Sequence, residues 1–137
     1  MNKHRYLRAY LAGIAIPTPA LLVAMTVYTV FRLIYHYPVP VERFIVFPMA
    51  VVPNAWGLWN VLFVAWRRHV PLPLGVHGAL LPLLLGPLGV VVSALLNFSI
   101  PGFGTRVFPI LAPVVLIAYY LAWKYAVGFL NRVLDVA

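Results

Sequence analysis

Residues 44–66 read FIVFPMAVVPNAWGLWNVLFVAW, an almost unbroken apolar run that ends at the basic pair Arg67 and Arg68. A membrane-spanning helix needs about 20 predominantly apolar residues. This run is long enough to cross a bilayer, yet it also holds two prolines, two asparagines and a glycine. It therefore predicts a transmembrane helix with a specific packing surface.

Three further apolar runs occupy residues 9–31, 75–98 and 107–130. The connections are short and rich in turn-forming Pro and Gly, so successive spans should be antiparallel neighbours. The first run is too long for the apolar region of a cleaved signal peptide, and we expect it to be retained. We predict an all-α integral membrane protein, in which one domain over residues 1–137 forms a tightly packed bundle of four transmembrane helices at 9–31, 44–66, 75–98 and 107–130.

The composition supports a membrane class. Hydrophobic residues make up 64% of the 137-residue chain and charged residues only 9%, whereas soluble domains are roughly 25% charged. Cysteine is absent, which excludes disulfides and thiolate metal sites. The net charge of +8 would suggest nucleic acid on a soluble protein. Here the basic residues flank apolar runs, so we expect contacts with anionic lipid head groups and no nucleic-acid binding.

The ten Lys and Arg residues are distributed unequally between the two sides of the predicted bundle. The side with both termini holds Lys3, Arg5, Arg8, Arg67, Arg68, Lys124 and Arg132, and the other side holds Arg32, Arg43 and Arg106. Cytoplasmic loops of membrane proteins carry the excess of positive residues. We therefore expect both termini in the cytoplasm, and the cell (inner) membrane as the location.

Small residues follow one face of each predicted span at the helical period of about 100° per residue. In lipid, such residues let helices approach closely, so they mark helix contacts. The second span adds an opposite aromatic face, which we expect to point outward. The predicted packing residues are Gly57, Gly78, Gly86, Gly89, Ala20, Ala24, Ala118 and Ala122, and the predicted outward face is Trp56, Trp59, Phe63 and Trp66.

Every span also carries two prolines, and a proline inside a helix removes one backbone hydrogen bond. We therefore expect proline-kinked helices. Two explanations are open: kinks that fit neighbouring helices, or broken helices whose freed carbonyls coordinate a solute. The prolines are Pro17, Pro19, Pro48, Pro53, Pro82, Pro87, Pro109 and Pro113.

Asn54 is the most informative polar residue, because it falls near the middle of the second span on its small face. An amide at that depth needs hydrogen-bond partners. Tyr28, Ser93, Asn97 and Tyr119 lie on the small faces of other spans and could join it. The resulting polar cluster is either a clasp between helices or a ligand or solute site.

Of the four histidines, only His77 is expected to enter the membrane. A lone imidazole could ligate a porphyrin-type metal or shuttle protons. A helix that begins at Leu74 would more simply place it in the head-group zone. We therefore predict neither a cofactor nor a metal.

The predicted spans contain no Asp or Glu of the kind that ion-coupled transporters use. The chain also lacks a paired-carboxylate, Ser/His/acid or HExxH arrangement, so we do not expect an enzyme. The leading hypothesis is a non-catalytic polytopic membrane protein that acts as a subunit, an assembly module or a lipid- or pigment-contacting module. Its partners would be further copies of itself or other membrane subunits. The alternative is a small channel or facilitator for an uncharged or anionic solute, with a polar site around Asn54.

Overall fold

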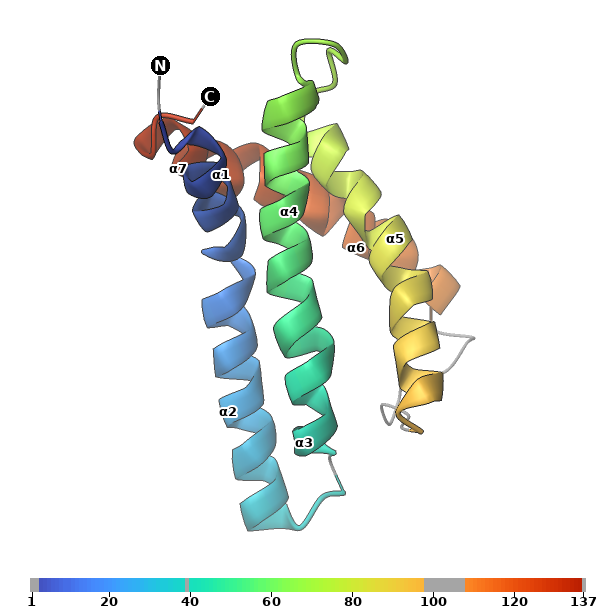
Figure 1. Cartoon of the computed structure of the whole chain (residues 1–137). Coiled ribbons are helices and arrows are strands. Elements are labelled where there is room, and N and C mark those ends of the chain that lie inside the picture. Colours follow the sequence, from blue (N-terminus) through green and yellow to red (C-terminus); the bar gives the residue numbers. More distant parts are fainter. Residues whose placement is uncertain (1–2, 39, 98–107, 137) are drawn as a thin grey trace.

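The computed structural model describes residues 3–38, 40–97 and 108–136, and every regular element in these ranges is helical (Figure 1). Four helical stretches are long and apolar enough to cross a membrane: Arg5–Tyr35, Val41–Trp66, Leu74–Leu95 and Pro109–Val133. The predicted all-helical class and the four span-like helices are confirmed. The predicted end of the third span at 98 and start of the fourth at 107 lie outside the described residues.

The first stretch is divided into α1 (Arg5–Ile14) and α2 (Pro17–Tyr35). Pro17 is the first residue of α2, a position where the missing N–H costs little. Across the break, the Thr18 hydroxyl donates to the Ile14 carbonyl at 2.6 Å. A short interruption therefore separates the two helices while the chain keeps its direction (Figure 1).

The second stretch comprises α3 (Val41–Phe44), the π-helix η1 (Ile45–Ala50) and α4 (Val51–Trp66). Phe47 leaves the helical region, with φ −140° and ψ 125°, and its peptide bond to Pro48 is cis. Residues that precede proline are disfavoured in the α region, which accounts for this extended residue. The irregular backbone is confined to the first part of the stretch, so α4 itself is continuous.

The remaining chain forms α5 (Leu74–Leu95), α6 (Phe108–Leu121), the π-helix η2 (Ala122–Val127) and α7 (Gly128–Val133). Pro82 and Pro87 lie inside α5, and Pro113 lies inside α6. In Figure 1, α7 returns to the side of α1, so both termini and the α4–α5 connection lie at the same end of the molecule.

Two apolar clusters hold the helices together. One joins α4, α5 and η2 through Trp56, Leu81, Leu85, Trp123 and Val127. The other joins α1, α4 and the end of the chain through Ala9, Val64 and Val136.

Away from the termini the packing is open. Figure 1 shows α5 diverging from α4 in that direction, and Pro17 is the one buried residue of the 19 in α2. The expectation of a bundle that is tightly packed throughout is therefore wrong for the described helices. Close packing is concentrated toward the end that carries both termini.

The predicted small-residue contacts hold for Gly57 and Gly78. A methyl group added to Gly57 would lie 2.5 Å from Cδ2 of Tyr10, and one added to Gly78 would overlap the side chain of Trp123. A methyl group added to Gly89 would lie 3.0 Å from the ring of Phe47. Glycine at these positions therefore permits the observed approach of neighbouring helices.

The remaining predicted packing residues pack less closely. Ala20 and Ala118 are exposed, so the predicted packing role is wrong for these two in the described fold. The reason is geometric, because these two residues lie on parts of α2 and α6 that the neighbouring described helices do not cover. Three further members are half-buried: Gly86, Ala24 and Ala122.

Candidate functional site

The backbones of α1 and α4 approach each other closely where the two helices cross. A methyl group added to Gly13 would lie 2.5 Å from the Trp56 carbonyl oxygen and 2.7 Å from Cα of Gly57. A side chain at Gly13 would therefore meet the main chain of α4, whereas a methyl group added to Gly57 would meet the side chains of Tyr10 and Ile14. The crossing also brings Ala9, one turn earlier on α1, next to Asn60 on α4.

Asn60 and Asn131 form a buried amide pair next to this crossing. Their exposed fractions are 0% and 1%. The Asn60 Nδ2 group donates to Asn131 Oδ1 at 2.8 Å and to the Ala9 carbonyl at 2.7 Å, and Asn131 Nδ2 donates back to Asn60 Oδ1 at 3.0 Å. Buried amides need hydrogen-bond partners, and through these bonds the amide pair joins α1, α4 and α7.

Two arginines of α1 hold the C-terminal segment. Arg5 Nε donates to the Val136 carbonyl at 3.2 Å, and Arg8 donates to the Leu134 carbonyl at 3.0 Å. The last carbonyls of a helix lack partners within it, and a cation there interacts favourably with the helix dipole. The beginning and the end of the described chain are therefore tied to each other.

His77 joins α5 to α4 through a reciprocal pair of hydrogen bonds. Its Nε2 atom lies 2.9 Å from the Trp59 carbonyl, and Trp59 Nε1 donates to the His77 carbonyl at 2.7 Å. The two rings stack with centroids 4.8 Å apart, and Phe63 lies 5.3 Å away. A carbonyl can only accept, so Nε2 carries the proton. With an exposed fraction of 7%, His77 is buried and serves as a helix connector.

Trp56 lies in the core with an exposed fraction of 5%. Its ring is 5.1 Å from Tyr119 and 5.2 Å from Trp123, and its Nε1 donates to the Tyr119 hydroxyl at 3.4 Å. The predicted outward orientation of Trp56 is therefore wrong. The cause is that α4 lies between α1 on one side and α5 with η2 on the other, so its small and aromatic faces both pack.

The other members of the predicted outward face differ from one another. Trp59 and Phe63 are half-buried beside His77, so they too face a neighbouring helix. Trp66 at the end of α4 is 55% exposed and is the one member that points outward as expected. The aromatic stripe is thus mainly a contact between α4 and α5.

Asn54 lies outside this interior. Its side chain is exposed, with Oδ1 accepting from the Tyr10 hydroxyl and Nδ2 donating to the Ala50 carbonyl at 2.7 Å. The amide is therefore held between α1 and its own helix.

The residues expected to join Asn54 are bound elsewhere. Ser93 donates to the Val90 carbonyl of its own helix at 2.9 Å. Tyr28 packs edge-on against Phe44 with ring centroids 5.8 Å apart. Asn97 adopts a left-handed φ of 50°, and its backbone carbonyl accepts from Arg43. With Tyr119 bound to Trp56, the five candidate residues do not form one cluster.

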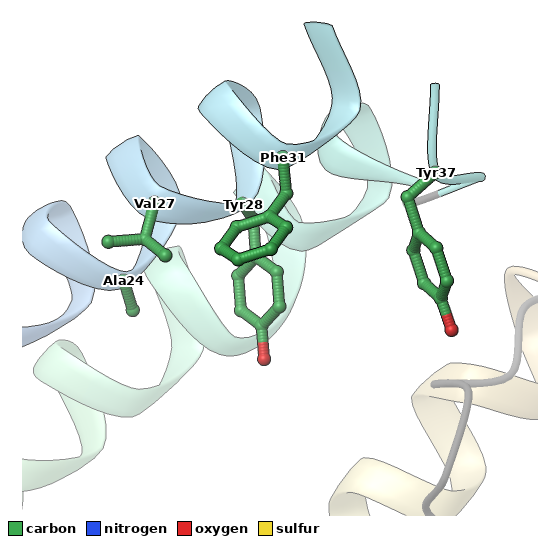
Figure 2. Close-up of a pocket in the computed structure, with 5 residues that line it drawn as sticks. All are labelled: Ala24, Val27, Tyr28, Phe31 and Tyr37. Atoms are coloured by element: carbon green, nitrogen blue, oxygen red, sulfur yellow. The ribbon is translucent and has the colours of Figure 1, made fainter. Parts of the chain in front are cut away.

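A groove follows the second half of α2. Ala24, Val27, Tyr28, Phe31 and Tyr37 line it and enclose about 490 Å³. Figure 2 shows the Tyr28 and Tyr37 rings extending to the same side, with their hydroxyls at the outer ends. The lining is otherwise hydrocarbon, so the groove offers a surface to an apolar group.

Sequence reasoning missed Asn131, Tyr10 and Trp123. A buried amide needs an amide or carbonyl partner, so Asn131 could have been paired with Asn60 as another asparagine near the end of the bundle that was predicted to carry both termini. Tyr10 and Trp123 carried no comparable signal, because their roles depend on which helices cross.

Within the described ranges, no three His, Asp or Glu side chains gather where a metal ion could bind. The chain matches no known protein family, no curated protein and no solved structure.

Proposed function

We propose that the protein is a non-catalytic, polytopic membrane protein that serves as a subunit or assembly module, in a complex with other membrane proteins or with itself. It is embedded in the cell (inner) membrane with both termini in the cytoplasm. The observations that carry the proposal are two pairs of polar residues, Asn60 with Asn131 and Trp59 with His77, which join helices whose outer surfaces are mainly apolar.

The polar side chains of the outer surfaces support insertion into lipid. The hydroxyls of Thr18, Thr26 and Thr29 each donate to the carbonyl four residues earlier in the chain, and Ser93 donates to its own helix. Hydrocarbon offers no partner for a polar group, so groups that face it must be satisfied within the protein. These four side chains meet that requirement.

The polar groups of the interior support a structural role. The Asn60–Asn131 pair and the reciprocal Trp59–His77 bonds use these groups to hold helices together. A facilitator would need polar groups directed into a water-filled path instead. The expected cluster around Asn54 would have supplied them, but its candidate members are engaged separately.

Reporter fusions at each terminus test the proposed topology. We expect both reporters to give the cytoplasmic signal, because the basic residues are concentrated at the end where both termini lie. A cytoplasmic signal from one terminus and an external signal from the other would refute the four-span arrangement.

Solute flux into liposomes tests the alternative. The purified protein in liposomes should conduct neither small anions nor uncharged solutes above the rate of empty vesicles. A flux that Asn54→Leu abolishes without loss of stability would establish the facilitator instead.

A further inference from the structure

We infer that Asn54 is an association site through which two copies of this chain pair within the membrane. This inference rests on the proposed membrane location. The proposed function allows the chain to associate with itself. The inference names the residue through which it does so, and it names the partner as a second copy in the same orientation.

The first step is the depth of Asn54. It lies at the middle of the apolar Val41–Trp66 stretch, with its side chain exposed on the surface of α4. Polar side chains within membrane spans are costly when they face lipid, and they are found against protein or water-filled cavities. An exposed carboxamide at mid-depth therefore indicates a surface that another protein covers.

The second step is the hydrogen-bonding capacity of the amide. A carboxamide has two N–H donors and an oxygen with two acceptor lone pairs. Among the described residues, Asn54 gives one N–H to the Ala50 carbonyl and accepts one bond from Tyr10. One donor and one acceptor site remain, and a carboxamide with both is complementary to a second copy of itself.

The third step is the surface around Asn54. Ala50, the last residue of η1, lies one turn before Asn54, and Leu58 of α4 lies one turn after it on the same face; both are exposed, Leu58 at 62%. Small residues permit close helix approach in lipid, and side-chain amides add hydrogen bonds between helices. Ala50 supplies the small residue and Asn54 the amide.

Symmetry fixes how two copies meet. Two chains inserted in the same orientation are related by a two-fold axis along the membrane normal, so an isologous contact pairs the same patch of each. The two α4 helices are then parallel at the axis, where Asn54 meets Asn54 and Leu58 meets Leu58. Reciprocal amide bonds between the copies use the donor and the acceptor left on each side.

The absence of cysteine makes a sharp experiment possible, because a single introduced cysteine can only link to its copy. Leu58→Cys is compared with Ile117→Cys, which lies on α6 and is 60% exposed. Both variants are reconstituted in bilayers at high lipid-to-protein ratio and oxidised. Disulfides require Cα atoms about 5.5 Å apart, so we expect fast cross-linking at Leu58→Cys and only slow collisional cross-linking at Ile117→Cys.

The amide is then varied in the Leu58→Cys background. Asn54→Leu should weaken association about tenfold, since both reciprocal bonds are lost, while Asn54→Gln keeps a carboxamide and most of the association. Equal cross-linking rates at Leu58→Cys and Ile117→Cys, or full association in Asn54→Leu, would overturn the inference.

Alkaline carbonate extraction of the same membranes distinguishes a failure of the association site from a failure of the proposed membrane location. Extraction would refute the membrane assignment itself, whereas a retained protein without Leu58→Cys cross-links would refute only the association site.

Discussion

Replacing Gly13 with alanine should destabilise the protein through a clash between two backbones. The new methyl carbon would lie 2.5 Å from the Trp56 carbonyl oxygen, 2.7 Å from Cα and 2.9 Å from the nitrogen of Gly57. Favourable contacts between carbon atoms lie at about 3.5–4.0 Å, so α1 and α4 must separate by roughly 1 Å. No rotamer change relieves the contact, because all three atoms belong to the main chain.

That separation would also weaken the buried amide pair. The bond from Asn60 to the Ala9 carbonyl, one turn from Gly13, is 2.7 Å long. A displacement of about 1 Å takes it beyond hydrogen-bonding distance. Overpacking costs about 1–3 kcal/mol, and an unsatisfied buried group costs a further 1–3 kcal/mol or so. Alanine recovers about 1 kcal/mol of helix propensity, so the free energy of unfolding should fall by roughly 1–5 kcal/mol.

The assay is reversible unfolding in mixed detergent micelles, followed by tryptophan fluorescence. Gly128→Ala is the matched control, because its added methyl would make ordinary contacts of 3.4 Å with Leu74 and 3.6 Å with the Trp123 carbonyl. We expect this control to be as stable as the parent or slightly more stable. A Gly13→Ala protein that unfolds at the same denaturant fraction as the control would refute the backbone contact between α1 and α4.

Three further outcomes follow from the interior contacts. Asn60→Leu should cost about 1–3 kcal/mol by leaving the Asn131 amide unsatisfied, and adding Asn131→Leu should cost less than the sum of the two single changes, as a double-mutant cycle would measure. His77→Phe keeps a ring next to Trp59 but loses one hydrogen bond, so a loss of about 1 kcal/mol is expected in the same unfolding assay, and no loss would refute that bond. Deleting residues 134–137 removes carbonyls that bind α1 and a buried valine, so the melting temperature should fall clearly. An unchanged value would show that this segment does not hold α1.

The four helices could be predicted from the sequence because the length of an apolar run is a one-dimensional property. Which face of each helix packs against a neighbour was harder to predict, as α4 illustrates. Its sequence separates a small face containing Gly57 from an aromatic face containing Trp56, and only one of them was expected to pack. Helical periodicity shows that two faces differ but does not state how many neighbours a helix has. The position of α4 between α1 and α5 decides that, and it depends on contacts between residues far apart in the chain.

The partners of the candidate polar residues were also hard to predict from the sequence, for a similar reason. The reciprocal bonds of His77 and Trp59 involve a backbone carbonyl on each side. No residue type marks a carbonyl that will be used in this way, so the pair left no signal in the sequence. The third helix begins at Leu74, one residue before the predicted start at 75, yet the direction of the His77 side chain depends on α4.

The two asparagines of α4 show how position on one helix separates two roles for the same side chain. They are six residues apart, which at about 100° per residue directs them roughly 120° away from each other. Asn60 is directed toward α1 and α7, where it is fully buried, both of its N–H groups donate and its oxygen accepts from Asn131. Asn54 is directed to the open surface, where its amide keeps a free donor and acceptor site. Replacement of Asn60 by leucine should therefore reduce the stability of the single chain, and the same replacement of Asn54 should reduce the association of two chains. In the proposed association, asparagine thus serves the fold at position 60 and assembly at position 54, because the chain's own helices cover Asn60 and leave Asn54 exposed.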